Sequence, residues 1–401
     1  MTGTAAPATR VPVPREIWVL VTAAFVIALG FGIIAPILPQ YAASFDVGVA
    51  AASAIVTVFA LARMVFAPAA GSLISRLGER WMYIAGLAVV AASSFLCAVA
   101  VGYWDLLLWR GLGGLGSVTF TVSSMGLIVR LAPPTARGRT SALYGSAFLL
   151  GNIIGPILGT FLAVLGYRVA FAIYGGTVVV ALLVVLVFLR EPPKDPAVQD
   201  VRPRMVLSEA MALPDYRALL VSGFANGWAT FGVRIALVPL MAAHVPTIGA
   251  PMAGIALTLM AVGNVIAQQL TGRMVDALGR RPVLMVGLLV TGLTTLVFGW
   301  AVSLPVFLGL SLLTGVGASM IQPASQAMLA DIIGSDRNGG QALSTFSMST
   351  DLGSIAGTLL AGLIADVFGF GWAFFITGCM VLLAIGPWWR LRASAGGPVS
   401  P

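Results

Sequence analysis

The run IWVLVTAAFVIALGFGIIAPILP, at residues 17–39, contains no charged side chain over its 23 residues. A helix needs about 20 mostly apolar residues to cross the hydrocarbon core of a membrane. Eleven comparable apolar runs follow along the 401-residue chain. Because lipid offers no hydrogen bonds to backbone N–H and C=O groups, a run that enters a membrane must form a helix. The sequence therefore predicts an all-α integral membrane protein with twelve transmembrane helices.

The predicted spans fall into two groups of six. The first group occupies residues 17–39, 49–73, 81–101, 106–129, 140–165 and 170–189, and the second occupies residues 218–242, 250–270, 283–302, 306–330, 341–365 and 373–389. Hydrophobic residues make up 59% of the chain and charged residues only 9%. A chain with so few charges cannot cover a water-exposed surface, which excludes an ordinary soluble protein.

An internal repeat relates the two groups of spans. Phe31 and Gly32 recur as Phe231 and Gly232, at an offset of 200 residues. Further glycine pairs follow in order, and their offset rises smoothly to 203. These pairs are Gly71 and Gly272, Gly78 and Gly279, Gly113 and Gly315, Gly151 and Gly353, and Gly175 and Gly378. An ordered series over six helices indicates two duplicated six-helix halves, a pattern typical of transporters.

The repeat sets the domain boundaries. We expect an N-terminal tail at 1–15, a first half at 16–189, a linker at 190–217, a second half at 218–391 and a C-terminal tail at 392–401. The linker contains the proline-rich segments REPPKDP and VRPR. Its MVLSEAMAL segment, residues 205–213, is compatible with a short amphipathic helix and equally with an irregular tether.

The 22 lysine and arginine side chains are distributed unevenly about the predicted membrane. Arg63, Arg110 and Arg234 lie inside spans, and Arg168 lies on the predicted outer side. The other 18 lie on the inner side, so the positive-inside rule places both termini in the cytoplasm. This topology accounts for the net charge of +8 without a nucleic-acid partner. Because Lys194 is the single lysine, the composition is compatible with a GC-rich bacterial genome and a bacterial inner membrane.

The cysteines and the histidine predict no metal or reaction centre. Cys97 and Cys379 both lie inside apolar runs, where a buried, unpaired thiol is the expected state. His244 is the single histidine, which excludes metal sites built from His pairs and leaves no His-based catalytic triad. We therefore expect no cofactor and no enzymatic activity.

The first span carries the motif LGFGIIAPILP at residues 29–39. Gly30 and Gly32 allow a neighbouring helix to approach closely. Pro36 and Pro39 free backbone carbonyls and bend the outer end of the helix. The motif is compatible with a helix that flexes and with one that is kinked only for packing.

The fifth span carries the motif GNIIGPILG at residues 151–159. Gly151, Gly155 and Gly159 are spaced four apart and form a smooth face for another helix, which Pro156 bends. The corresponding face of the second half, at residues 353–357, lacks the proline. The two halves are therefore predicted to differ here.

Charged side chains inside the spans are the candidate coupling groups. Arg110 lies in LLLWRGLGGLGS, residues 106–117, and must find carboxylates, carbonyls or water, so we expect it to face a central cavity. Asp351 is the one acid near the centre of a span. Ionising it there is costly, but a cation would offset that cost, so its charge can switch. Arg234 in the same half and Arg63 in the other are the candidate partners, and a permanent structural ion pair is the alternative.

Polar side chains amid the apolar spans predict the lining of a substrate cavity. They are Asn226, Trp228, Asn152, Asn264, Gln322, Ser325 and Gln326. Such a lining suits amphiphilic molecules. The same side chains are also compatible with ties between helices.

Two inner loops share a further motif, GSLISRLGER at residues 71–80 and GRMVDALGRR at residues 272–281. The residues that we single out in the two copies are Gly71, Gly78, Arg80, Gly272, Asp276, Gly279 and Arg280. The first copy has Ser75 at the place of Asp276. The two loops therefore differ in charge.

These features resemble the major facilitator superfamily, and the motifs resemble its twelve-helix drug:proton antiporter branch, over nearly the whole chain. The first span fits the branch pattern LGxGxxxPxxP, and the fifth is similar to GxxxGPxxGG with Thr160 in place of the last glycine. The loops are similar to GxLxDxxGRR. The resemblance implies that Arg110 takes part in proton transfer. It also implies an inner gate locked by the loop aspartate, which Ser75 cannot supply unless Glu79 replaces it.

The predicted function is that of a secondary transporter in which an exported small lipophilic compound or drug exchanges for protons by alternating access. The proton gradient supplies the energy, and the expected partners are the substrate, protons and membrane lipid. We expect a monomer, because one chain holds both halves. A proton-coupled importer or a uniporter of the same fold is the first alternative. A membrane-embedded sensor or enzyme is the second, but no cluster of His, Cys or paired acids forms a reaction centre for it.

Overall fold

The computed structural model describes residues 14–131, 137–190, 205–334 and 340–394, which form helices joined by turns. The first half forms α1 (Arg15–Ile34), α2 (Leu38–Ala43), α3 (Val49–Leu77), α4 (Glu79–Ala98), α5 (Tyr103–Leu131), α6 (Arg137–Ala163) and α7 (Tyr167–Phe188). The second half forms α9 (Pro214–Asn226), the π-helix η2 (Gly227–Val233), α10 (Arg234–His244), α11 (Met252–Leu278), α12 (Arg280–Phe298), α13 (Leu304–Ile333), α14 (Gly340–Phe368), α15 (Phe370–Leu383) and α16 (Gly386–Ser394). Between the halves lies α8 (Leu207–Ala212).

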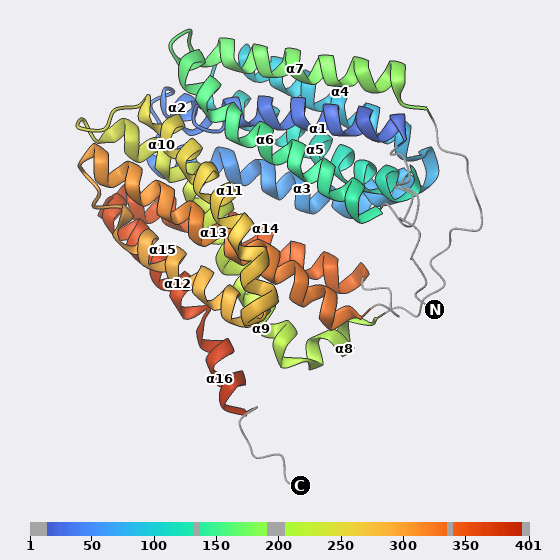
Figure 1. The fold of residues 1–401 in the computed structure, drawn as a ribbon. Coiled ribbons are helices and arrows are strands. Elements are labelled where there is room, and N and C mark those ends of the chain that lie inside the picture. The colour runs from blue at the N-terminus through green and yellow to red at the C-terminus, as the bar shows by residue number, and fades with distance from the viewer. Residues whose placement is uncertain (1–13, 132–136, 191–204, 335–339, 395–401) are drawn as a thin grey trace, which may run out of the picture.

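The two halves form two bundles that diverge from one end of the molecule (Figure 1). They lie close together where α2 and α10 are found, which we call the α2 end. They separate toward the opposite end, where α1 begins, α7 ends and α8 lies, which we call the α8 end. Contacts between the halves run mainly through two helix pairs, α3 with α14 and α6 with α11.

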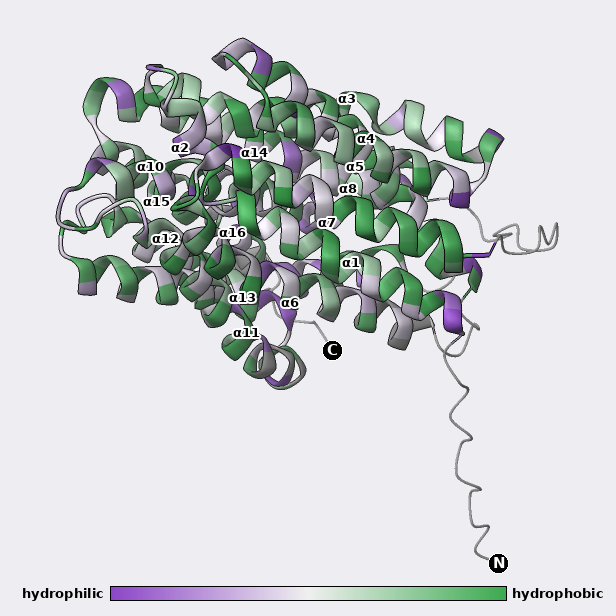
Figure 2. Cartoon of the chain, turned by 90° about the horizontal axis from the view of Figure 1, so that it is seen from above, coloured by the Kyte–Doolittle hydropathy of each residue, from purple (hydrophilic) through white to green (hydrophobic). Residues whose placement is uncertain are grey.

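The number of membrane-spanning helices agrees with the sequence. Ten described helices are long and apolar enough to cross a membrane. With α11, which holds a shorter apolar stretch, and the continuous rod α9–η2–α10, the described residues contain twelve long rods. Apolar residues also cover the outward faces of these rods (Figure 2), which only lipid can solvate well. The chain is thus an all-α, multi-pass membrane protein.

Three predicted spans are not single α-helices: those at residues 17–39, at 218–242 and at 373–389, the last of which a turn at residues 384–385 divides between α15 and α16. Pro36 has no N–H, so α1 ends at Ile34, a turn follows and α2 starts at Leu38. In the seventh span, α9 is followed by one stretch of π-helix. Gly227 and Gly232 of η2 lie so close to the α14 backbone that a methyl group on either would overlap a carbonyl oxygen there.

The linker segment at residues 205–213 contains the short helix α8. Of the two alternatives for this segment, a short helix or an irregular tether, the helix is confirmed. The first N–H of α8, on Leu207, donates to the Gln341 side chain of α14 at 3.1 Å. The rest of the linker, residues 191–204, lies outside the described residues.

The glycine-rich faces of the first and fifth predicted spans meet each other. Gly32 of α1 lies against Gly155 and Pro156 of α6, and Gly159 lies against the backbone at Ile33. No side chain could be added at these glycines without moving a backbone. The contact holds α1 and α6 at a distance that larger residues would not allow.

A carboxylate of the second half caps a helix of the first half at the α2 end. Asp366, near the end of α14, accepts hydrogen bonds from the backbone N–H groups of Val49 at 2.6 Å and Ala50 at 2.8 Å. These are first-turn groups of α3, which have no partner within their own helix. Gly48 occupies the cap position and has no side chain to bind them. The positive end of the α3 dipole further favours the carboxylate.

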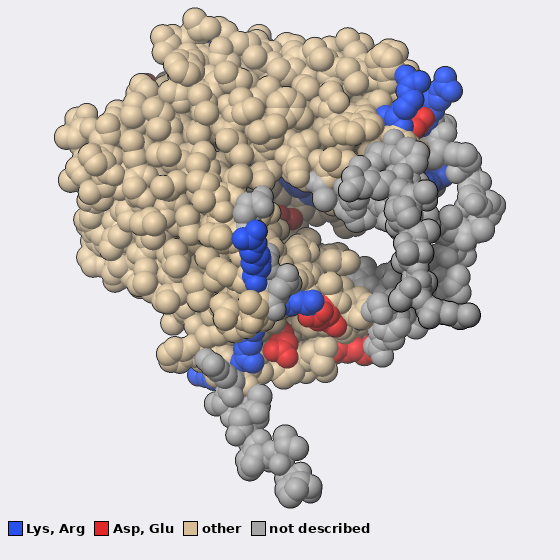
Figure 3. All heavy atoms as spheres, viewed as in Figure 1, with Lys and Arg blue, Asp and Glu red and all other residues tan. Residues whose placement is uncertain are grey.

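Other contacts close the α2 end around this cap. Gly362 of α14 packs on Ala50 and Ser53, and the Gln40 side chain of α2 donates to the Ala250 carbonyl at 3.4 Å. At the α8 end, by contrast, no hydrogen bond or ion pair joins the halves within the described ranges. A hollow opens there between the halves, and charged side chains line it (Figure 3). The structure is therefore closed at the α2 end and open at the α8 end.

The carboxylate cap leads to a prediction about the conformational equilibrium. We expect Asp366→Asn to favour opening at the α2 end, because the amide keeps only one of the two acceptor oxygens and loses the negative charge that the α3 dipole favours, which together cost about 1 kcal/mol, or about fivefold in a population ratio. Spin labels at Leu165→Cys and Val302→Cys, which are exposed at this end on opposite halves, would report the opening by pulsed electron resonance distances.

The matched control is Asp105→Asn, because the Asp105 carboxylate accepts a hydrogen bond from Val101 of its own half. We expect this variant to leave the distance distribution unchanged. An equal effect of both substitutions, or no effect of Asp366→Asn, would contradict the assignment of Asp366 as a contact that holds the halves together.

Candidate functional site

Arg110 of α5 lies on aromatic rings inside the first half. It is 4% exposed, and its guanidinium carbon lies 4.2 Å from the centre of the Phe59 ring and 5.9 Å from that of Phe31. Its buried Nε atom has no hydrogen-bond partner among the described residues. Among the described residues, no carboxylate or carbonyl group accepts a hydrogen bond from the Arg110 Nε atom. The ring faces of Phe59 and Phe31, which attract a cation, lie beside the guanidinium instead.

Arg63 of α3 shares the same ring. Its guanidinium carbon lies 5.9 Å from the centre of Phe59, and its side chain donates a hydrogen bond to the Ser117 hydroxyl of α5 at 2.5 Å. Phe59 therefore contacts both cations, a role that sequence reasoning missed. A signal was present, because Phe59 precedes Arg63 by four residues and such pairs lie on one helix face.

Asp351 of α14 faces Arg63 across the interface between the halves. Their charges attract each other, but no salt bridge forms within 4.0 Å in the described part of the chain. Of the two partners considered for Asp351, the structure brings Arg63 near it, and no interaction joins Asp351 to Arg234.

The helix register explains this separation between Arg63 and Asp351. The helices α3 and α14 touch where Gly362 packs on Ser53. Arg63 lies 10 residues beyond Ser53, and Asp351 lies 11 residues before Gly362. At 1.5 Å per residue, both charges are about 15 Å from the contact, toward the α8 end. Because the helices diverge in that direction, the distance between Arg63 and Asp351 depends on how far the halves are open.

Arg234 follows directly after the π-helix, at the start of α10. It makes no hydrogen bond, ion pair or ring contact with the residues that the structure describes. Arg234 and Asp351 lie at different depths along the bundle. Gly227 packs beside Thr350, the neighbour of Asp351, and Arg234 lies seven residues beyond Gly227. The two side chains are therefore about 10 Å apart along the bundle axis.

A sequence model of the Major Facilitator Superfamily matches residues 20–214 and 219–400 of the chain. The chain belongs to this superfamily. It is accordingly a membrane transporter and not an enzyme. The two-half architecture is the one expected from the sequence resemblance.

Two curated relatives of this major facilitator transporter carry names that refer to drug resistance. The Quinolone resistance protein NorA of Staphylococcus aureus (strain N315) is 28% identical over 180 residues, which cover 45% of this chain and 46% of NorA. The chain thus matches a little under half of NorA. Multidrug resistance protein 1 of Bacillus subtilis (strain 168) is 26% identical over 356 residues, which cover 87% of this chain and 89% of the relative.

Solved transporter structures share the fold. A bacterial homologue of the human lysosomal transporter Spinster, in an inward-facing and unoccupied conformation, superposes with a TM-score of 0.78. It is 14% identical, and the match covers 96% of this chain and 98% of that one. The D-xylose–proton symporter superposes with a TM-score of 0.75 at 18% identity, covering 93% of this chain and 97% of that one.

The polar residues predicted to line the transporter cavity divide into two groups. Asn226 donates to Gln322 at 3.4 Å and accepts from Thr230 at 3.0 Å, and Trp228 donates to Thr377 at 3.1 Å. Asn226 and Trp228 are therefore buried ties between helices. Ser325 is also buried, whereas the side chains that remain at least partly accessible are Gln322, Gln326, Asn152 and Asn264.

The inner loop motifs of the transporter use glycine to join consecutive helices. Gly78 and Gly279 have φ values of 88° and 86°, in the left-handed region that favours glycine, and each lies between two helices. The backbone places Gly272 and Asp276 in α11, but the side chains of Ser75 and Asp276 lie outside the described residues. The effect of replacing the loop aspartate by Ser75 therefore stays a prediction.

The cations of the two loop motifs bind within their own halves. Arg80 donates to a carbonyl of α7 at 3.2 Å, and Arg280 forms an ion pair with Asp331 of α13. Glu79, the candidate replacement for the missing aspartate, pairs with Arg130 at 2.5 Å. All three contacts stay within one half, as expected when the halves are open at the α8 end.

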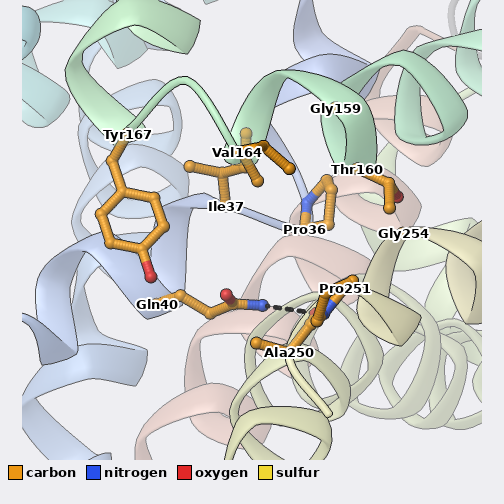
Figure 4. A pocket seen from close by; sticks show the side chains of 11 residues that line it. Pro36, Ile37, Gln40, Gly159, Thr160, Val164, Tyr167, Ala250, Pro251 and Gly254 are labelled. Atoms are coloured by element: carbon orange, nitrogen blue, oxygen red, sulfur yellow. Dashed lines mark hydrogen bonds between the residues drawn. The ribbon is translucent and has the colours of Figure 1, made fainter.

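A small pocket remains in the closed seam at the α2 end (Figure 4). Pro36 and Gln40 of the first half and Gly254 of the second are among its lining residues. Its volume is about 160 Å³, close to that of a cavity that holds benzene and below the range of drug-sized sites. The pocket is thus a gap in the seam that is too small for a drug-sized substrate.

The shared ring leads to a prediction about stability. We expect Phe59→Leu to destabilise the transporter by about 1 kcal/mol for each lost cation–π contact, and Phe59→Tyr to have little effect because tyrosine keeps the ring face. Thermal unfolding of the purified protein in detergent would measure the shift in Tm. Equal Tm values for Phe59→Leu and the native protein would show that the ring does not hold the two arginines.

Proposed function

We propose that this transporter is a proton-coupled antiporter that exports small lipophilic compounds or drugs from a bacterial cytoplasm by alternating access. The observation that carries the proposal is the placement of Asp351 on α14 and Arg63 on α3, two helices of opposite halves that touch at the α2 end and diverge toward the α8 end. The names of the relatives NorA and Multidrug resistance protein 1 support the drug as substrate. The proton gradient is the energy source, with no cofactor, and the chain works as a monomer in the inner membrane.

Charge placement assigns the orientation of the proposed exporter. Among the described residues, the arginines outside the membrane centre lie at the α8 end, with the exception of Arg168 in α7. The positive-inside rule then makes the α8 end cytoplasmic, together with the start of α1 and the end of α16. In this orientation the hollow opens to the cytoplasm, and the Asp366 cap closes the outer side.

The proton acts through the Asp351–Arg63 attraction. Closing the α8 end brings α3 and α14 together, so an ionised Asp351 favours the outward-facing state. At an effective dielectric constant of about 20, halving a separation of about 8 Å between unit charges gains about 2 kcal/mol. A proton on Asp351 removes this gain, so the protonated carrier favours the inward-facing state.

Antiport follows from these two preferences. The outward-facing carrier takes up a proton from outside, opens to the cytoplasm and releases the proton there. Substrate then binds in the hollow near Gln322 and Gln326, and the ionised carrier closes the α8 end and exposes the substrate to the outside. Coupling requires that proton and substrate prefer different facing states, since a ligand bound equally to both shifts neither.

The test uses inside-out vesicles with an acidic interior and a fluorescent pH indicator. We expect addition of a lipophilic dye panel to release protons from vesicles that carry the native protein. Asp351→Asn should abolish the release at equal expression, because the amide cannot carry a proton. The control Asp105→Asn lies at the outer end and should release protons like the native protein.

Other outcomes separate the remaining possibilities. Release by both native protein and Asp351→Asn would keep antiport but reject Asp351 as the proton carrier. Proton movement in the same direction as the substrate would replace export by the importer alternative. No proton movement with substrate uptake intact would indicate a uniporter.

A further inference from the structure

The centre of the transporter carries more positive than negative charge. Three guanidinium groups, those of Arg63, Arg110 and Arg234, lie within the spans, against the single carboxylate of Asp351 in the described part of the chain. Arg63 is the one arginine that Asp351 attracts, and it also binds Ser117. The other two arginines have no acceptor among the described residues. Two uncompensated cations therefore lie near the membrane centre.

Such cations are expensive if they have only a structural role. A charge in a low-dielectric region without an opposite charge or a hydrogen-bond acceptor costs several kcal/mol. The rings of Phe59 and Phe31 stabilise Arg110, but a ring face does not satisfy the buried Nε–H of that side chain. Arg234 has not even a ring beside it among the described residues. An anion bound to Arg234 would supply the acceptor that this side chain lacks among the described residues, and it would also offset the positive charge of Arg110.

The internal repeat places the two arginines at similar depths in opposite halves. Phe31 contacts Arg110, and the repeat makes Phe231 the equivalent of Phe31. Arg234 lies three residues beyond Phe231, a rise of about 4.5 Å. Because the two halves repeat one fold, equivalent positions lie at the same depth. Arg234 is therefore within one helical turn of the depth of the Arg110 site.

The exposed face around Arg234 belongs to the interface between the halves. Phe231 is 40% exposed, and Arg234 and Ile235 are partly exposed, whereas their neighbours on both sides along the rod are buried. The helix α10 packs against α2 and α3 of the first half. An arginine that faced lipid at this depth would cost more than one that faces a water-filled cavity. The face of Phe231 and Arg234 therefore points toward the interface between the halves rather than toward lipid.

We infer that the exported compound is an amphiphilic anion, an apolar ring system with a carboxylate or similar oxyanion, whose charged group binds Arg234. The guanidinium fork matches a carboxylate in two parallel hydrogen bonds. Arg110 adds positive potential from the opposite half, and Phe231 offers an aromatic surface to the ring system. This inference names the substrate class of the proposed exporter and rests on that function.

Binding of three matched probes to the purified full chain in lipid nanodiscs tests the inference. The probes are 2-naphthylacetate, its neutral amide and the cation 2-(2-naphthyl)ethylamine, measured by isothermal titration calorimetry. We expect the carboxylate to bind most tightly. Arg234→Gln should weaken carboxylate binding about tenfold or more, as loss of a charged hydrogen bond predicts, and leave amide binding unchanged.

Two further variants serve as controls. Arg234→Lys keeps the charge and should retain most of the preference for the carboxylate. Arg168→Gln removes a charge at the outer end, where Arg168 donates to the Ala100 carbonyl, and should change no affinity. Unchanged amide binding shows in the same experiment that the Arg234→Gln variant is folded.

The inference is overturned if the amide or the amine binds as tightly as the carboxylate, if the carboxylate does not bind, or if Arg234→Gln weakens carboxylate and amide equally. The measurement needs no pH gradient. If the native protein releases no protons in the vesicle experiment but binds the carboxylate more tightly than the amide and the amine, proton-coupled export is rejected and the anion site is kept. The reverse pattern would keep export and reject the anion site.

Discussion

The contact between α3 and α14 is the constraint on which the rest of the structure depends. At the α2 end, Asp366 binds the free N–H groups of α3, and nearer the middle of the two helices Asp351 faces Arg63. One helix pair thus carries both a hydrogen-bonded closure and a charge pair that is sensitive to separation. In the proposed alternating-access cycle, opening of the α2 end accompanies closing of the α8 end, so the Asp366 cap would break as Asp351 approaches Arg63.

Much of the fold could be predicted because lipid leaves a chain few choices. Long apolar runs must be helices, so the twelve rods and the repeat follow from composition and spacing. The breaks within the helical rods were harder to predict. The end of α1 at Pro36 has a clear sequence signal, whereas η2 arises from the close approach of Gly227 to α14. That approach depends on tertiary packing, which no local pattern in one sequence reports.

The sequence identifies the charged residues of the candidate site, but it does not show which of them lie together. Rarity alone identifies Arg110, Asp351, Arg63 and Arg234, since ionised groups are costly inside a membrane. Which of them meet depends on helix register and on the angle between the halves. The aromatic surroundings of Arg110 were not foreseen, because Phe59 is one of 20 phenylalanines in an apolar chain.

The trans cap on α3 links the folding of one helix to the transport cycle. Gly48 offers no side chain to the first turn, so α3 depends on the other half for its N-terminal hydrogen bonds. If the α2 end opens, Val49 and Ala50 must exchange the carboxylate for water, and the first turn loses part of its stability. Local fraying of α3 is then thermodynamically coupled to the facing state. A residue at position 48 that capped its own helix would break this link and let the halves separate without that cost.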